Sequence, residues 1–202
     1  MQLLVADDLA TLASAWVAER ASRCDPFTIA LAGGSTPKRT YERLSEFQLR
    51  WNSWHVWWGD ERMVPAGHPD SNERMAREAL LSRVPIPEAQ IHPLRSPEIE
   101  LPDRFDLVLL GIGQDGHTAS LFPGDPALGA TEPVVRVMRP DHPRLSLTYP
   151  VLNAARAAAF MVSGEGKREM VARVLAGDPQ LPAARVHAET TVILADRAAA
   201  PA

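Results

Sequence analysis

The 202-residue sequence has little of several features that mark particular classes of protein. Its single cysteine, Cys24, excludes an internal disulfide, and no second cysteine or histidine lies near it at metal-binding spacing. No apolar run reaches the roughly 18 residues of a membrane-spanning helix, and the N-terminal residues lack the basic segment of a signal peptide. With 21 basic against 25 acidic side chains, the chain has no surplus of positive charge for nucleic acid. We therefore expect a cytoplasmic protein without a nucleic-acid or membrane partner.

The sequence does have enough apolar residues for one sizeable core, since 46% are hydrophobic and 23% charged. Short apolar or β-branched runs predict strands at residues 3–6, 28–32, 54–58, 105–110, 134–138, 145–149, 157–162 and 192–194, with a further short strand possible near Ile91. Helical spacing and capping residues predict helices from Asp7 or Asp8 to about Arg23, over 37–47, from Asp70 or Ser71 to Leu81, over 167–175, and at the extreme C-terminus.

Strands and helices alternate through most of the chain, which is typical of a parallel sheet covered on both faces. The closely spaced strands after Pro133 depart from that alternation and indicate a small antiparallel addition. We expect one α/β domain over residues 1–202, with a Rossmann-like, mainly parallel sheet, helices on both faces and this antiparallel addition. Its assembly state is expected to be a monomer or a small homo-oligomer.

The run FDLVLLGIGQDGHTASLFPG, residues 105–124, joins an apolar strand to a glycine-rich loop. Gly113 and Gly116 permit tight turns and close approach of a ligand, and they leave Asp115 and His117 as the reactive side chains. The alternative is an ordinary strand-to-helix turn with a surface histidine. A second glycine loop upstream favours the functional interpretation, because two such loops at strand ends create a ligand crevice between them.

The second loop, GGSTP, follows a predicted strand and opens a predicted helix, where backbone N–H groups form an anion site. Gly33 and Gly34 would let a phosphate approach the backbone, while Ser35 and Thr36 would donate hydroxyl hydrogen bonds. The Gly-Lys-Ser/Thr ending of a nucleotide-binding P-loop is absent. A plain helix cap at Ser35 or Thr36 is the alternative.

A third loop, WWGDER, contains Asp60, Glu61 and Arg62 in succession. Adjacent residues of an extended segment point to opposite sides, so Asp60 and Glu61 are not expected to form one acid–base pair. Arg62 would match two phosphate oxygens with its planar guanidinium, or else pair with Glu61 or Glu73.

Two later positions add positive charge. Arg144 precedes a predicted strand, and Lys167 stands at a helix start, where the helix dipole disfavours a cation unless an anion is near. A solvated surface lysine is the alternative. The histidines other than His117 show no metal-binding spacing, so neither a metal nor another cofactor is expected.

Taken together, GGSTP, WWGDER, GIGQDGHTASLFPG and GEGK resemble the 6-phosphogluconolactonase family, which is related to glucosamine-6-phosphate deaminases and ribose-5-phosphate isomerases. The residues after His117, from Thr118 to Phe122, are similar to the lactonases, whereas the deaminases are expected to continue with an Ile-Ala-Phe-like sequence. The resemblance implies hydrolysis of 6-phospho-D-glucono-1,5-lactone to 6-phospho-D-gluconate in the oxidative pentose phosphate pathway, without a cofactor. The chain looks short for this family, with a trimmed 123–131 region, and Ser146 and Tyr149 depart from its usual pattern after Arg144.

The chemistry of a lactone suits these residues. Histidine exchanges protons near neutral pH, so His117 is expected to act as general base for water, while Asp115 would orient it or hold sugar hydroxyls. The substrate is expected to contact Gly33, Gly34, Ser35, Thr36, Asp60, Arg62, Gly113, Gly116, Arg144 and Lys167, with the phosphate at Gly34–Thr36, Arg62 and Lys167. Two other functions remain open: deamination or isomerisation of an amino sugar phosphate, and a non-catalytic phosphosugar sensor.

Overall fold

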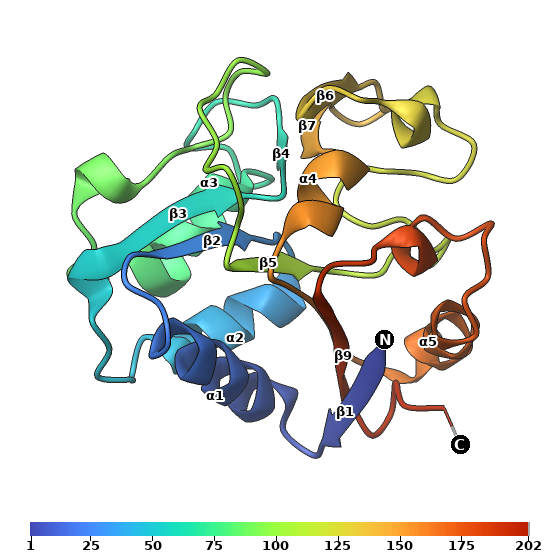
Figure 1. Ribbon diagram of the computed structural model, residues 1–202, viewed down its shortest axis with the longest axis horizontal. Coiled ribbons are helices and arrows are strands. Elements are labelled where there is room, and N and C mark those ends of the chain that lie inside the picture. The colour runs from blue at the N-terminus through green and yellow to red at the C-terminus, as the bar shows by residue number, and fades with distance from the viewer. Residues whose placement is uncertain (202) are drawn as a thin grey trace.

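The computed structural model describes residues 1–201, which form two β-sheets and their connecting helices (Figure 1). The larger, six-stranded sheet has the order β1-β9-β8-β5-β2-β3 and is parallel throughout. Its strands are β1 (Gln2–Ala6), β2 (Phe27–Leu31), β3 (Trp54–Trp58), β5 (Leu107–Leu110), β8 (Ala157–Val162) and β9 (Thr190–Asp196). The expected mainly parallel α/β fold is therefore confirmed.

The central strands of this sheet are buried along their whole length. Every residue of β5 (LVLL) and of β8 (AAAFMV) is buried, which is typical of parallel strands that have helices on both faces. The edge strand β1 is only half-buried to exposed. The tryptophans of the β3 region all lie in the core, so their role is packing: Trp51, Trp54, Trp57 and Trp58.

Figure 1 shows helices α1 (Leu9–Ala21) and α2 (Ser35–Leu44) on one side of the row of strands. Helices α4 (Tyr149–Ala154) and α5 (Arg168–Leu175) lie on the other side. Two of the expected helix starts are confirmed by their caps. Asp8 accepts the N–H groups of Ala10 and Thr11, and Ser71 Oγ accepts that of Arg74 at the start of α3 (Asn72–Ala76). The helix continues from α3 as a π-helical turn, η2 (Arg77–Leu81).

The smaller sheet is antiparallel and has the order β4-β7-β6, with β4 (Asp60–Arg62), β6 (Val134–Val137) and β7 (Arg144–Leu147). Two of its strands are the expected antiparallel addition. The third, β4, continues the chain from β3 through Gly59, and the N–H of Leu147 donates to the Gly59 carbonyl at 2.8 Å. One continuous chain segment thereby joins the two sheets, and the smaller sheet faces the ends of the parallel strands.

Several expected elements differ from those observed. No helix forms at residues 197–201, where the chain makes turns, so the prediction of a C-terminal helix is wrong. Tyr149 begins α4 rather than ending a strand, because Pro150 fits the first turn of a helix and cannot donate to a sheet. Ile91 makes only an isolated bridge with Val56. Within residues 1–201, no helix combines the length and the apolar character that crossing a membrane requires.

Candidate active site

A cleft of about 710 Å³ opens where the carboxyl ends of β2, β3 and β5 face the smaller sheet. Ligands of open parallel sheets bind at this edge, since the loops that follow the strands converge there. The volume lies in the range of small-molecule sites, about 300–1,000 Å³. Of the residues expected at the site, the lining includes Gly33, Asp60, Arg62, Gly113, Asp115, His117, Arg144 and Lys167.

The loop after β5 presents His117 to the cleft against the Asp115 carboxylate. His117 Nδ1 lies 2.5 Å from Asp115 Oδ1, and the same oxygen accepts the backbone N–H of His117 at 3.1 Å. With a carboxylate at Nδ1, the imidazole carries its proton there and keeps an unprotonated Nε2 when neutral. Gly113 has to be a glycine, because a Cβ there would overlap the His117 ring.

Two charged groups beside His117 have shifted pKa values. Partial burial acts to raise the pKa of Asp115, but hydrogen bonds from the ring and backbone of His117 prevail and lower it below its ordinary value. Burial lowers the pKa of Lys167, while the nearby Asp115 charge acts in the opposite direction. Lys167 Nζ donates to the carbonyl of Ile112 at 2.7 Å, which fixes the ammonium group at the glycine loop.

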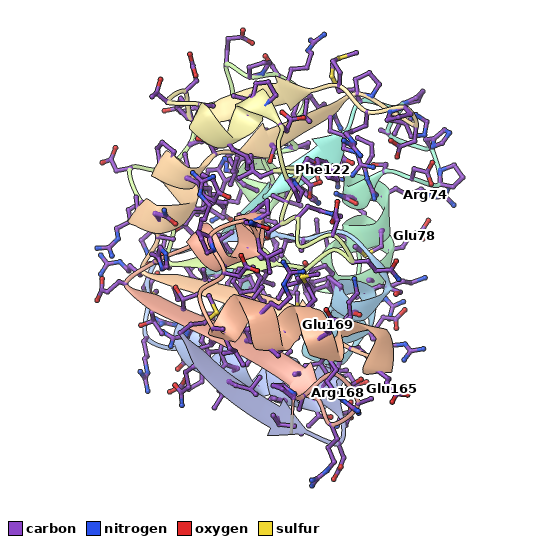
Figure 2. All side chains as sticks on the ribbon, turned by 90° about the vertical axis from the view of Figure 1, so that its right-hand side faces the viewer. Arg74, Glu78, Phe122, Glu165, Arg168 and Glu169 are labelled. Atoms are coloured by element: carbon purple, nitrogen blue, oxygen red, sulfur yellow. The ribbon has the colours of Figure 1, made fainter. Side chains whose placement is uncertain are left out.

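Phe122 supports the histidine from the side of the smaller sheet. Its ring centroid is 4.4 Å from that of His117, and the guanidinium carbon of Arg139 lies 3.9 Å from the Phe122 centroid. Figure 2 shows Phe122 above α5, which begins at Arg168. Packing of this kind restricts the ring of His117, so its nitrogen atoms keep a fixed direction in the cleft.

Arg62 and Arg144 lie opposite each other in the β4–β7 register, and both side chains line the cleft. Arg62 Nη1 donates to Asn72 Oδ1 and to the Asp70 carbonyl, while Arg144 Nη2 donates to the carboxylate of Asp141. Among residues 1–201, the Nε atoms of both arginines are buried without a hydrogen-bond partner. Within these described residues, Arg62 forms no ion pair with Glu61 or Glu73, which was the alternative expected from the sequence. Its charge is therefore available to an anion.

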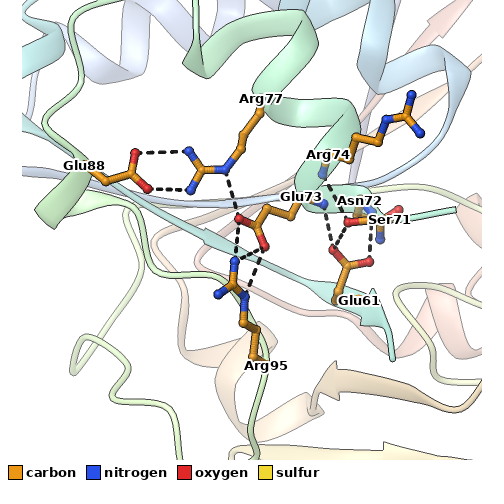
Figure 3. Close-up of polar contacts among 8 residues, drawn as sticks. All are labelled: Glu61, Ser71, Asn72, Glu73, Arg74, Arg77, Glu88 and Arg95. Carbon is orange, nitrogen blue, oxygen red and sulfur yellow. Dashed lines mark hydrogen bonds and ion pairs between the residues drawn. The ribbon is translucent and has the colours of Figure 1, made fainter. Parts of the chain in front are cut away.

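Glu61 does not line the cleft, and its carboxylate holds the first turn of α3 (Figure 3). Its carboxylate accepts the backbone N–H groups of Arg62, Asn72 and Glu73 at 2.7–2.8 Å. The expectation that Asp60 and Glu61 face opposite ways is confirmed. The Asp60 carboxylate instead accepts the hydroxyl of Ser120 at 2.6 Å and lines the cleft.

Four expected site residues lie outside the lining. Ser35 and Thr36 begin α2 and face a neighbouring hollow of about 430 Å³, together with Asp7, Arg39 and Asp196. Gly34 precedes the helix with a φ of 108°, and α2 has no side-chain cap. Gly116 has a φ of 81° and packs against Leu181 and Met170, so its role in the loop is structural.

Other lining residues were not expected from the sequence, among them Asn72, Gln114, Phe122 and Arg139. The Asn72 amide lies so close to Gly33 that a side chain at Gly33 would overlap it. Phe122 stands within the glycine-loop motif and could have been included on that ground. Asn72 and Arg139 carry no local signal, because they reach the cleft from segments far away in the sequence.

The sequence profile described as Glucosamine-6-phosphate isomerases/6-phosphogluconolactonase matches residues 3–194. The chain belongs to this family. Its relatives include the 6-phosphogluconolactonase of Synechocystis sp., which is 46% identical over 182 residues that cover 78% of this chain and 76% of the relative. The 6-phosphogluconolactonase of Nostoc sp. is 45% identical over 172 residues, which cover 74% of this chain and 72% of that protein.

Solved structures agree with this family membership. The 6-phosphogluconolactonase of Thermotoga maritima superposes with a TM-score of 0.87 at 29% identity, covering 97% of this chain and 99% of that one. The Trypanosoma brucei 6-phosphogluconolactonase gives 0.82 at 31% identity, covering 98% and 97%. A monomeric glucosamine-6-phosphate deaminase gives 0.84 at 19% identity, which demonstrates a common fold alone.

Proposed function

We propose that this chain hydrolyses 6-phospho-D-glucono-1,5-lactone to 6-phospho-D-gluconate, the lactonase step of the oxidative pentose phosphate pathway. One observation carries the proposal: a histidine held by a carboxylate shares a cleft with Arg62, Arg139 and Lys167, which form no ion pair within residues 1–201. The relatives named 6-phosphogluconolactonase support the same reaction. On this view residues 1–202 form one catalytic domain.

His117 is the general base in this proposal. Its Nε2 takes a proton from water as the water oxygen attacks the lactone carbonyl carbon, and Asp115 stabilises the imidazolium that forms. The proton then moves to the ring oxygen as the carbon–oxygen bond of the lactone breaks. Asp115 remains ionised throughout the neutral range, since its pKa lies below the ordinary value.

The phosphate end is assigned to Arg62 and Lys167 near the uncapped start of α2, with Arg144 beside Arg62. The buried, unpartnered Nε of Arg62 supports this assignment, because a guanidinium gains most from an anion when it is desolvated. At the turn before α2 only Gly33 lines the cleft, so the phosphate is given to these cations and not to the expected Gly34–Thr36 segment.

The developing oxyanion needs a separate donor. Backbone N–H groups of the glycine loop are largely occupied: Gly113 donates to the His117 carbonyl, Gly116 to the Gly113 carbonyl, and His117 to Asp115. That arrangement favours a cationic side chain of the cleft over the loop backbone as the oxyanion donor.

The direct test is an assay of the tag-free protein on freshly generated 6-phosphogluconolactone, with spontaneous ring opening subtracted. The proposal predicts catalysed formation of 6-phosphogluconate and no ammonia from glucosamine 6-phosphate. Ammonia release without lactone hydrolysis would identify a deaminase. Binding of phosphosugar without turnover of either compound would identify a sensor.

A further inference from the structure

Outside the lining of the cleft, three side chains with metal-binding atoms come together: His68, Asp70 and His142. One ligand atom of each lies within 4.8 Å of the other two. His142 Nε2 is 3.0 Å from Asp70 Oδ2, and His68 Nδ1 is 3.7 Å from the same oxygen. The three residues belong to two loops, with His68 and Asp70 between β4 and α3 and His142 between β6 and β7.

These distances suit one small divalent ion. Zinc binds nitrogen and carboxylate oxygen at about 2.0–2.2 Å, so two ligand atoms of a tetrahedral site stand roughly 3.3–3.5 Å apart. The observed separations lie on either side of that value. The two imidazole rings meet at 77° with centroids 5.3 Å apart, so neither ring is stacked over the other.

The ligand atoms are not already engaged by arginine or lysine. Among residues 1–201, the Asp70 carboxylate forms ion pairs only with His68 and His142. His68 Nδ1 accepts the backbone N–H of Asp70 at 3.2 Å, so this nitrogen is unprotonated, and a bound ion would take the place of that hydrogen bond. The side chains of His68 and His142 are 37% and 29% exposed, which leaves an ion accessible from solvent.

Both loops are fixed in place by the protein. The N–H of Met63 donates to the Pro143 carbonyl at 2.8 Å and joins the start of one loop to the end of the other. Arg74, labelled at the right of Figure 2, donates to the Gly67 carbonyl in the first loop. A cluster on such a frame needs little rearrangement to close around an ion.

Each loop also holds one of the cleft arginines. The Asp70 carbonyl accepts Arg62 Nη1 at 2.9 Å, and Asp141, the residue before His142, accepts Arg144 Nη2 at 2.6 Å. An ion bound to this cluster would therefore clamp together the two segments that position Arg62 and Arg144.

We propose that His68 Nδ1, His142 Nε2 and the Asp70 carboxylate bind a divalent transition-metal ion of the zinc class. Imidazole nitrogen with one carboxylate favours Zn²⁺, Ni²⁺ or Cu²⁺ over Mg²⁺ and Ca²⁺, which take oxygen ligands. Water completes the coordination. The site lies outside the cleft and does not depend on the reaction that the cleft performs.

The test titrates tag-free full-length protein with ZnCl₂ by isothermal calorimetry and with CoCl₂ by visible absorption. We expect one ion bound per chain. His68→Ala, His142→Gln and Asp70→Asn should each weaken binding by roughly tenfold or more, because each removes a ligand. His187→Ala is the matched control, since His187 is exposed and stands outside the cluster, and it should bind like wild type.

His117→Ala tests whether the ion binds instead at the His117–Asp115 pair of the cleft. It should retain the ion, while loss of binding in His117→Ala and not in His142→Gln would overturn the proposal. Equal affinity in wild type, His68→Ala and His142→Gln would also overturn it, as would the absence of binding at millimolar Zn²⁺. Urea unfolding guards against misfolded variants: Zn²⁺ should raise the midpoint of wild type and leave that of His142→Gln unchanged.

Discussion

At the scale of single residues, the cleft combines the proton acceptor His117 with Arg62 and Lys167, which form no ion pair within the described residues. A guanidinium Nε that is buried without a hydrogen bond is unfavourable by itself, and Arg62 and Arg144 each have one. An anionic ligand would relieve both. The missing hydrogen bonds of the two Nε atoms and the preference for a phosphorylated substrate therefore have one physical explanation: the arginines are placed to bind an anion.

Arg62→Ala and Lys167→Ala should each raise KM for the phosphorylated lactone about 10- to 100-fold, with a smaller effect on kcat. The reason is that a charge-assisted contact to a phosphate remote from the reacting carbon contributes about equally in the ground and transition states. Steady-state kinetics on the phosphorylated and unphosphorylated lactones measures the effect.

Arg136→Ala provides the matched control, because Arg136 is an exposed arginine on β6 that does not line the cleft. Its KM should equal that of wild type. If Arg62→Ala and Lys167→Ala both behaved like Arg136→Ala, the phosphate end would have to be placed elsewhere.

Asp115→Asn tests the two roles considered for this carboxylate. With Nδ1 of His117 2.5 Å from Asp115 Oδ1, we expect an orienting role and a fall in kcat of about 10- to 1,000-fold at nearly unchanged KM. A rise in KM with kcat preserved would instead assign Asp115 to the sugar hydroxyls. Parallel measurement with Asp125→Asn, an acidic residue that does not line the cleft, controls for the loss of one charge.

Some site residues were predictable and others were not. Asp115, His117 and Arg62 directly follow strand signals, so their arrival at one sheet edge follows from local pattern. Asn72, on α3, and Arg139, after β6, reach the cleft through tertiary packing between segments far apart in the sequence. No spacing in the sequence carries that information.

At the scale of elements, Glu61 connects a strand to a helix. It belongs to β4, yet it accepts N–H groups from the first turn of α3, and Glu73 of that turn pairs with Arg77 and Arg95 (Figure 3). Burial raises the pKa of Glu61, while the backbone N–H bonds act in the opposite direction. The short helix α3 therefore depends on a capping acceptor outside itself.

Glu61→Gln should lower the free energy of unfolding by about 1–3 kcal/mol, because the amide nitrogen cannot accept the N–H groups that then lack a partner. Urea denaturation measures this loss. Glu88→Gln is the comparison, since Glu88 is exposed and its pairing with Arg77 contributes about 0–1 kcal/mol. Equal stability of the two variants would contradict the capping role.

Element boundaries were less predictable than element types. The strand β4 consists of three charged residues and lacks apolar alternation, so its pairing with β7 is determined by tertiary contact. Helix α4 covers YPVLNA, whose apolar residues suit a strand equally well, and only Pro150 distinguishes the two. Residues 197–201 are alanine-rich and favour a helix by propensity, but they form turns instead.

At the scale of the whole molecule, the two tyrosines report on core integrity at alkaline pH. Burial raises the pKa of Tyr149 to about 12 and that of Tyr41 further. A tyrosine whose pKa is raised on folding contributes its full stabilisation of the folded state when the pH is below the ordinary tyrosine pKa of about 10. That contribution is lost as the pH rises toward the pKa of the folded state. The protein should therefore lose stability between about pH 10 and pH 12.

Urea unfolding at about pH 9 and about pH 11 measures this loss, and phenolate absorbance should appear together with unfolding. In Tyr149→Phe the drop in unfolding free energy between the two pH values should be smaller by about 1 kcal/mol. An identical drop in Tyr149→Phe and wild type would mean that Tyr149 titrates freely in the folded protein.

The class of the fold was predictable, because continuous apolar strands such as β5 and β8 require a covered parallel sheet. The strand order was not, since nothing local in β1 determines that it pairs with β9 from the opposite end of the chain. The approach of the smaller sheet to the glycine loop was likewise not predictable from the sequence. It rests on long-range contacts such as Ser120 with Asp60.

The most direct measurement is kcat of His117→Asn for lactone hydrolysis, corrected for spontaneous ring opening. Loss of the general base should lower kcat about 100- to 10,000-fold, while calorimetry should find 6-phosphogluconate bound about as tightly as by wild type. Turnover at the wild-type rate in this variant would contradict the account.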